Sequence, residues 1–329
     1  MKFVIDMMGG DNGLKATIGA TKEFIKRHKD VEFFLIGDLN ALSEFNNQTN
    51  VHLVESKTVL KMDVDPLTAL REKDSSLMVA IDTYLKNGCD ALISAGSTGA
   101  LLSAAIFKIK RIEGITRPCL ITSFPTIKKD KKFVVCDLGA NNANTKEELV
   151  QFAIMGSIYY SIIYHSNNPE VYLLSNGTEE EKGSPLGKET YPLLKECKAI
   201  NFKGNIEARD PLFGDIDVLV ADGYSGNIYL KAVEGTAKAM SGMLKTAFKR
   251  NVFSMIGYLF SKKGIEEMKQ KMDYKNVGGA LLMGVNGVVI KAHGSSDVQS
   301  FLSALENGYK LVSVDIVNKF KEELNKWNQ

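Results

Sequence analysis

The sequence predicts an α/β protein built on a mostly parallel sheet. Segments of helical periodicity alternate with short β-rich apolar runs through most of the length, which is the pattern of repeated strand–helix units. Several apolar runs end directly in glycine-bearing turns. The 329 residues are 44% hydrophobic and 24% charged, an ordinary globular composition that suffices for a substantial core.

Periodicity and turn residues place the elements in chain order. The predicted helices cover about 14–29, 75–87, 99–110, 145–165 and 188–197. Predicted strands, besides the apolar runs discussed below, lie near 31–36, 51–55 and 171–174. Since no fixed repeat, low-complexity tract or obvious linker interrupts this order, we expect a single α/β/α domain over 1–329; two closely joined halves are the alternative.

The turn after the apolar run 91–93 is the most informative motif. It contains Ser94, Gly96, Ser97, Thr98 and Gly99 and leads into a predicted helix. Glycines allow close approach of a ligand, hydroxyls can donate, and the free amides of a helix start point to the same place. The turn is therefore a candidate phosphate cradle, with an ordinary glycine turn as the alternative.

The same arrangement recurs at the ends of other apolar runs. These are 3–6, followed by Gly9, Gly10 and Asp11; 133–137, ending in Asp137 and followed by Asn141; and 218–222, ending in Asp222 and followed by Gly223, Gly226 and Asn227. Parallel strands would gather these turns in one crevice, which is where open α/β sheets bind ligands.

The segment 238–271 departs from the alternation. Its apolar residues form one helical stripe, and it carries eight lysines or arginines against Glu266 and Glu267, whereas the whole chain has a net charge of only +2. We predict a basic amphipathic hairpin over about 238–272. Its stems are expected to pack against a sister subunit, and Phe253, Tyr258 and Phe260 near its tip are candidates for contact with an anionic membrane.

Absent motifs exclude several functional classes. The chain has no G-x-G-x-x-G, Walker, G-x-S-x-G or H-E-x-x-H sequence, so NAD, ATP, covalent serine catalysis and zinc lack support. We expect no cofactor and no metal. The small basic excess argues against nucleic-acid binding. Widely spaced cysteines, with no leader and no spanning apolar run, predict a cytoplasmic protein that is soluble or peripheral to a membrane.

A glycine-rich anion site without a protein nucleophile suits one chemistry, in which bound phosphate is itself the nucleophile. Held beside an activated acyl group, phosphate can attack directly while the protein supplies proximity and donors for the developing oxyanion.

The order of motifs resembles the bacterial phosphate acyltransferase family, PlsX. The matching stretches are 6–11, 66–76, 94–101, 125–126, 137–141, 177–183, 205–210, 222–227 and 291–297. The resemblance runs from residue 2 to about 311. Ser97 stands where members usually carry Asn, and Asn12 where many carry His.

The resemblance implies transfer of a fatty acyl group from acyl carrier protein to inorganic phosphate, giving acyl phosphate for a membrane glycerol-3-phosphate acyltransferase in phospholipid synthesis. It also implies a homodimer with a three-layer fold similar to phosphotransacetylases and isocitrate-type dehydrogenases, with protruding helices that correspond to the basic hairpin. The alternatives are an acyl-coenzyme A donor or a non-catalytic scaffold that binds carrier protein and membrane.

Candidate site residues follow from chemistry and position. Asn141 and Asn227 can donate to the thioester carbonyl, Asp137 and Asp222 can orient a cation or deprotonate phosphate, and His293 can bind phosphate or protonate the leaving thiolate. Each Asn or Asp can instead hold its own turn. Phosphate-binding candidates, beyond the turn residues above, are Arg71, Lys73, Lys182, Lys291, Gly294 and Ser295. The lysine run 128–132 can steer an acidic carrier protein, although such runs are usually only hydrated.

Overall fold

The computed structural model describes residues 1–272 and 278–327. Within them the strands form one eleven-stranded sheet. In sheet order these are β3 (Val51–Glu55), β2 (Glu32–Gly37), β1 (Lys2–Asp6), β4 (Ala91–Ser94), β11 (Val288–Lys291), β10 (Ala280–Met283), β5 (Cys119–Pro125), β6 (Lys132–Cys136), β9 (Val218–Val220), β7 (Glu170–Ser175) and β8 (Asn201–Glu207).

The sheet has two parallel halves that run in opposite directions. The N-terminal half consists of β3, β2, β1, β4 and β11, and the C-terminal half of β6, β9, β7 and β8. Between them, β10 is antiparallel to β11 and to β5, and β5 is antiparallel to β6. The expected mostly parallel α/β architecture is confirmed. The strands are not all parallel to one another, because three successive reversals between β11 and β6 turn the second half around.

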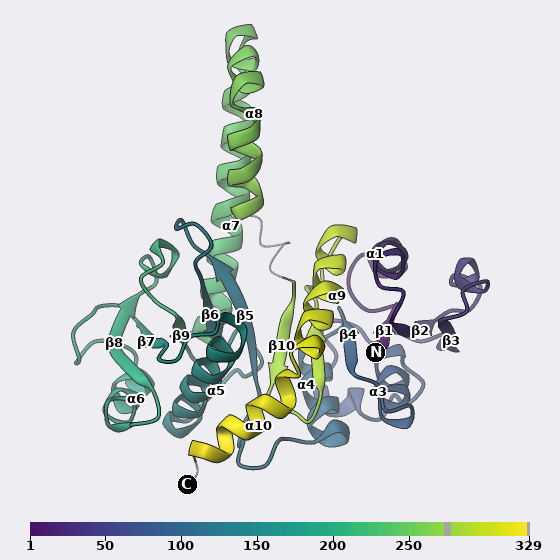
Figure 1. The fold of residues 1–329 in the computed structure, drawn as a ribbon, viewed down its shortest axis with the longest axis horizontal. Coiled ribbons are helices and arrows are strands. Elements are labelled where there is room, and N and C mark those ends of the chain that lie inside the picture. The colour runs from purple at the N-terminus through teal and green to yellow at the C-terminus, as the bar shows by residue number, and fades with distance from the viewer. Residues whose placement is uncertain (273–277, 328–329) are drawn as a thin grey trace.

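Helices cover both faces of the sheet (Figure 1). Side chains alternate along each strand, so Phe3 and Ile5 enter one buried cluster and Val4 enters the other. The first cluster is covered by α1 (Gly13–Arg27), α5 (Lys146–Tyr164), α6 (Pro185–Glu196), α9 (Val298–Ser313) and α10 (Ile316–Trp327). The second is covered by α2 (Pro66–Ala69), α3 (Ser76–Lys86), α4 (Thr98–Ala104) and the start of α7 (Gly223–Phe248).

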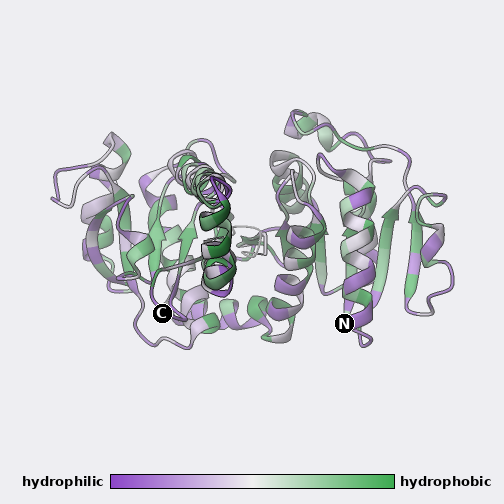
Figure 2. Ribbon diagram, turned by 90° about the horizontal axis from the view of Figure 1, so that it is seen from above, coloured by the Kyte–Doolittle hydropathy of each residue, from purple (hydrophilic) through white to green (hydrophobic). Residues whose placement is uncertain are grey.

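Colouring by hydropathy shows the strands largely hydrophobic between helices of mixed character (Figure 2). This is the pattern of a sheet that is buried on both faces. On the second face, α4 belongs to the N-terminal half and α7 to the C-terminal half, so the region over β11, β10 and β5 is where the two halves meet.

Most predicted helices are present with shifted ends. The helix predicted at 188–197 begins at Pro185, because Ser184 caps it by accepting the amide of Gly187 at 3.1 Å. The one predicted at 99–110 is α4 followed by a π-helical turn over Ala105–Ile109. Strands β5, β8, β10 and β11 and helices α9 and α10 were not predicted.

A helical hairpin leaves the body of the molecule (Figure 1). It consists of α7, capped by Asp222 and therefore beginning well before residue 238, and α8 (Val252–Met272). Phe253 and Phe260 are 85% and 88% exposed, whereas Tyr258 packs on Phe248 with ring centroids 5.3 Å apart. Among the described residues, no helix is long and apolar enough to span a membrane.

Candidate active site

A cavity of about 230 Å³ lies where the two halves of the sheet meet. Its walls come from α4, α7, the central strands and the segment after β11. The lining residues are Thr98, Leu120, Thr122, Leu138, Gly139, Asn227, Leu230, Lys231, Glu234, Gly279, Ala280, Lys291, Ala292, His293, Gly294, Ser296 and Ser300. The cavity thus brings Thr98, Asn227, Lys291, His293 and Gly294 together from the predicted site residues.

On the N-terminal side, the buried carboxylate of Asp6 organises two turns. It accepts a hydrogen bond from Ser94 Oγ at 2.7 Å and from the Gly9 amide at 3.3 Å, and Ser94 Oγ accepts the Gly96 amide at 3.0 Å. A Cβ on Gly9 would lie 2.7 Å from the Gly96 nitrogen, so the two backbones meet only because a side chain is absent.

These turns present one polar group to the cavity. Ser97 is 4% exposed and makes no side-chain cap for α4, and Thr98 follows it as the first residue of that helix. Thr98 lines the cavity, while Gly99 packs against Pro66, whose Cγ would lie 3.0 Å from an added Cβ. Ser94 and Gly96 therefore hold the conformation of the turn through their hydrogen bonds, and the Thr98 hydroxyl is the group available to a ligand in the cavity.

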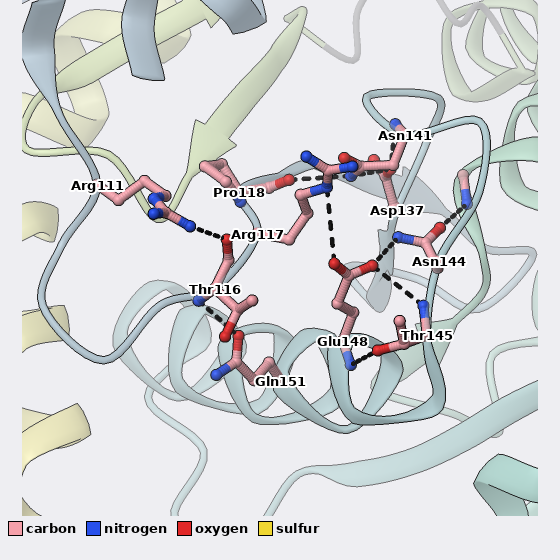
Figure 3. Close-up of polar contacts among 11 residues, drawn as sticks. Arg111, Thr116, Arg117, Pro118, Asp137, Asn141, Asn144, Thr145, Glu148 and Gln151 are labelled. Carbon is pink, nitrogen blue, oxygen red and sulfur yellow. Dashed lines mark hydrogen bonds and ion pairs between the residues drawn. The ribbon is translucent and has the colours of Figure 1, made fainter. Parts of the chain in front are cut away.

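On the C-terminal side, Asp137 plays the organising role (Figure 3). Its carboxylate is fully buried and accepts from the amides of Leu120 at 2.9 Å, Ala140 at 3.1 Å and Asn141 at 2.9 Å. Burial raises the pKa of Asp137, and the hydrogen bonds oppose that rise. Four donors, counting the Asn141 side chain, hold this carboxylate away from the cavity.

Asn141 is committed to the same network. Its Nδ2 donates to the Pro118 carbonyl at 3.0 Å and to Asp137 Oδ2 at 2.8 Å, and the residue is 4% exposed. The adjoining loop is anchored to α5 and α7, since Asn144 donates to Glu148 and accepts the Gly223 amide at 3.2 Å (Figure 3). The geometry thus gives Asn141 the turn-holding arrangement considered for it, and it does not line the cavity.

The start of α7 packs directly on that network. An added Cβ would lie 2.0 Å from the Asn141 carbonyl oxygen at Gly223 and 1.8 Å from the Asp137 carbonyl oxygen at Gly226. Asp222 caps the helix by accepting the Ser225 amide at 2.9 Å and hydroxyl at 2.7 Å. These residues set the position of α7, and Asn227, one residue further, reaches the cavity.

Lys291 supplies a buried cation at the end of β11. The residue is 8% exposed, and its Nζ donates to the carbonyls of Ala95, at 3.4 Å, and Ala292. Burial lowers the pKa of Lys291 to about 8, although Asp11 and Asp6 favour the charged form. Asp6 ends β1 and Asp11 lies in the turn that follows it, so both negative charges come from the N-terminal half of the sheet.

His293 follows Lys291 and has both ring nitrogens near polar groups. Nδ1 accepts the Ser295 backbone amide at 3.2 Å and lies 2.9 Å from Ser295 Oγ. Nε2 lies 3.7 Å from Glu234 Oε2. Burial lowers the pKa of His293, Glu234 raises it, and the neighbouring lysines lower it further.

The turn carrying His293 is joined to the first glycine turn. Asp11 donates its amide to the Gly294 carbonyl at 2.7 Å, and Asn12 Nδ2 donates to the Ser296 carbonyl at 3.0 Å. A Cβ on Gly10, whose φ is +92°, would lie 2.8 Å from the same Gly294 oxygen. Asn12 therefore acts here as a donor that positions the backbone of 293–297.

Other predicted residues lie outside the cavity lining. Arg71, Lys73 and Lys182 are exposed in loops, and Ser295 is exposed beside His293. In the lysine run 128–132, Lys128 pairs with Asp215 and Lys131 with Asp217. Half of the lysines in the run are therefore already engaged within the protein.

Sequence reasoning missed one wall of the cavity. Leu230, Lys231 and Glu234 line it together with Asn227. The signal was available, because positions three, four and seven residues after Asn227 share its helix face. Ser296 and Ser300 were also missed; within the part of the chain that the structure describes, the buried Ser296 Oγ has no hydrogen-bond partner.

The cavity combines an anion-binding set with hydroxyl and amide donors. Lys291 and Lys231 carry positive charge, Thr98 and Asn227 can donate hydrogen bonds, and an imidazole adjoins them. Three leucines in the lining, Leu120, Leu138 and Leu230, suit an apolar group. Among residues 1–272 and 278–327, no cluster of three or more His, Cys, Asp or Glu side chains could hold a metal ion.

Comparison with known proteins agrees with this chemistry. The family model described as fatty acid synthesis protein matches residues 1–319. A phosphate acyltransferase of Clostridium perfringens is 40% identical over 99% of this chain and 97% of its own length. One of Exiguobacterium is 41% identical over 98% of both chains.

Solved structures show the same fold at low sequence identity. A phosphotransacetylase from Streptococcus pyogenes aligns with a TM-score of 0.56 at 15% identity, covering 99% of this chain and 94% of its own. A branched-chain phosphotransacylase from Enterococcus faecalis aligns with a TM-score of 0.57 at 14% identity, covering 94% and 99%. The similarity of fold extends to a 4-hydroxythreonine-4-phosphate dehydrogenase from Klebsiella pneumoniae, with a TM-score of 0.50 at 8% identity, covering 95% of this chain and 99% of its own.

Proposed function

Because this chain belongs to the phosphate acyltransferase family, whose model matches residues 1–319, we propose that it transfers a fatty acyl group from acyl carrier protein to inorganic phosphate. The product is an acyl phosphate, which supplies a membrane glycerol-3-phosphate acyltransferase in phospholipid synthesis. The observation that carries this proposal is the convergence of Lys291, Thr98, Asn227 and His293 on one cavity with an apolar wall.

In the proposed reaction a phosphate oxygen attacks the thioester carbonyl carbon. The new carbon–oxygen bond forms, the carbon–sulfur bond breaks, and the thiolate leaves with the carrier and takes up a proton. Lys291 and Thr98 hold the phosphate, and Asn227 donates to the carbonyl oxygen as its negative charge develops. No residue of the protein becomes acylated.

The test is release of free carrier protein from palmitoyl-carrier protein by the purified chain, with acyl phosphate trapped by hydroxylamine. Release that requires phosphate and yields the hydroxamate supports the proposal. Palmitoyl-coenzyme A at the same concentration is the comparison donor. Faster transfer from coenzyme A would favour the phosphotransacetylase-type substrate, and binding of the carrier without turnover would favour a scaffold.

Carrier docking is proposed at Lys129 and Lys132, the exposed lysines of the run that are outside the two ion pairs. Acyl carrier protein is acidic, so opposite charge would steer it to this loop. Reversing both charges with Lys129→Glu and Lys132→Glu should raise KM for acyl-carrier protein and leave KM for acyl-coenzyme A unchanged. An equal effect on both donors would remove docking from the proposal.

The hairpin is proposed to serve both dimer and membrane contact. Met243 on its stem is 71% exposed, in the stripe expected to pack on a second copy, and Phe253 and Phe260 near its tip are the most exposed aromatic residues of the pair of helices. Phe253→Asp with Phe260→Asp should abolish co-sedimentation with anionic liposomes and keep activity in solution. The matched control is Phe107→Asp, at a 63% exposed phenylalanine on the body; unchanged sedimentation of the tip variant would refute membrane contact.

A further inference from the structure

Glu234 is a buried carboxylate to which no role has yet been given. It lies on the fourth turn of α7, its side chain is 10% exposed, and it lines the cavity to which His293 also contributes. Its Oε2 is 3.7 Å from Nε2 of His293, too long for a hydrogen bond and within ion-pair range. A carboxylate in an anion-binding cavity opposes phosphate, so its presence beside the imidazole calls for a specific reason.

The hydrogen bonds of His293 select one tautomer. A backbone amide can only donate, so the Ser295 amide at 3.2 Å requires a lone pair on Nδ1. The neutral ring therefore carries its proton on Nε2, the nitrogen that faces Glu234. When the ring is charged, the second proton is on Nδ1, which can then donate a hydrogen bond to the Ser295 hydroxyl oxygen 2.9 Å away.

Charges reach the ring from each element around it. Glu234, Lys231 and Lys238 project from α7, Lys291 ends β11, and Asp11 lies on the turn packed against Gly294. Burial and the three lysines disfavour the imidazolium. Among the described residues, Glu234 is a carboxylate near the ring that favours the imidazolium, and its position is fixed because α7 packs through Gly223 and Gly226 on the backbone of Asn141 and Asp137.

We propose that Glu234 is a positioning residue for His293, which keeps the ring proton on Nε2, directed to the cavity, and sustains the charged imidazole against the surrounding lysines. The proposal rests on the proposed function for its catalytic meaning. In that reaction the Nε2 proton is a hydrogen-bond donor to the phosphate or the thioester oxygen, and Glu234 touches neither.

The experiment measures the His293 ring directly by nuclear magnetic resonance of protein with labelled histidine. The chain has four histidines, and the His293 signals are assigned by their loss in His293→Gln. Nitrogen shifts report which ring nitrogen carries the proton, and a titration reports the pKa. We expect the Nε2–H form in the neutral wild type, and in Glu234→Gln a titration midpoint at lower pH.

Activity should follow the titration. In Glu234→Gln the limb of the pH–rate profile that reports the charged imidazole should move to lower pH together with the resonance midpoint. The kcat near neutral pH should fall about tenfold, which is part of the roughly 10²- to 10⁴-fold that a positioned acid–base group contributes. Glu234→Asp keeps the charge and should restore much of the midpoint and rate. A structural defect alone would lower activity without moving either pH value.

The chain offers a matched control in the pair His28–Glu306, whose Nε2 and Oε2 atoms lie 2.8 Å apart on the opposite face of the sheet. Glu306→Gln should change the His28 signals and leave His293 and the activity unaffected. An unchanged His293 midpoint in Glu234→Gln, or a neutral ring protonated on Nδ1, would overturn the proposal. Because these measurements need no acyl donor, failure of the proposed reaction would be seen separately, as absent turnover in the wild type.

Discussion

In the N-terminal half of the sheet the Asp6 carboxylate joins the turns after β1 and β4, whereas in the C-terminal half the Asp137 carboxylate is bound within its own turn and by β5, and the turn after β9 meets it through close backbone packing at Gly223 and Gly226. Gly9 and Gly96 touch beside Asp6 in the first case. In the second, the Asp137 carboxylate gathers four donors and α7 packs on it. The comparison teaches that strand-end aspartates act as scaffold in both halves, while the groups facing the cavity come later, at Thr98 and Asn227.

The largest loss of stability should come from adding a side chain at Gly226, where the start of α7 packs on the Asp137 backbone. Gly226→Ala would place a Cβ 1.8 Å from the Asp137 carbonyl oxygen, a backbone atom that cannot move aside alone. We expect the free energy of unfolding to fall by about 3 kcal/mol or more, as in severe overpacking. Urea unfolding measures it.

The control for that variant is Gly242→Ala in the exposed part of α7, where the added Cβ would meet no atom of the described residues within 4 Å beyond its chain neighbours and its own helix backbone. It should stabilise by about 0.5–1 kcal/mol because alanine favours a helix interior. Equal stability losses in the two variants would contradict the scaffold role of the Gly226 contact.

The next largest effect should be on kcat, when the Asn227 side-chain amide, the hydrogen-bond donor that the C-terminal half presents to the cavity, is removed. Asn227→Ala should lower kcat roughly 10²-fold, the usual loss when one oxyanion donor is removed, and leave the unfolding transition in place. Asn141→Ala is the informative partner, because its amide is bound to Asp137 and Pro118. Asn141→Ala should lower the free energy of unfolding more than it lowers kcat. A large loss of kcat with unchanged stability would make Asn141 a direct donor to the substrate.

The corresponding donor of the N-terminal half should matter less. Thr98→Val keeps the shape and removes one hydroxyl, so we expect about a tenfold loss of kcat/KM at low phosphate, near the energy of one hydrogen bond to a charged group. Initial rates over a phosphate series measure it. Wild-type rates at low phosphate would remove Thr98 from the phosphate site.

The smallest expected effect is a pH dependence shared by both halves. Burial raises the pKa of Asp6 and of Asp137 above the ordinary value of 3.8. A raised native pKa contributes stability below the unfolded value that is lost as the pH rises through the native one. The free energy of unfolding of the wild type, relative to that of Asp6→Asn, should therefore be greatest near pH 4 and should decrease toward neutral pH. Urea unfolding over a pH series measures this difference. An increase of the difference with pH would contradict the prediction.

The sequence predicted the α/β class and the strand-end turns because both leave local signals: alternating periods and glycines directly after apolar runs. It did not predict the reversal between halves. The strands responsible, such as β10 (Ala280–Met283), are short, and an apolar run carries no mark of its direction in the sheet. The sequence allowed Asp137 to hold its own turn, as its bonds from Ala140 and Asn141 show, but it did not predict the bond from Leu120, which lies on the distant strand β5.

Within the site, residues next to glycines were predictable and residues on a helix face were overlooked. Asn227 could be predicted because it follows Gly226 in a glycine-bearing turn, whereas Glu234 lies two helical turns further along α7 and belongs to no such motif. Lys182 and Arg71 were chosen for their charge, yet the structure leaves them in exposed loops. Charge alone does not distinguish a solvated lysine from one that is buried like Lys291.

The pairing of β11 with β4, and of β10 with β5, sets the order in which the protein can be completed during synthesis. Residues 280–291 leave the ribosome after every other strand of the described sheet, yet they fill its centre. Until then β4 and β5 expose unpaired edges, which are templates for aggregation. A nascent chain stalled before residue 280 should accordingly need chaperone protection, and the full sheet should close only in the last step of folding.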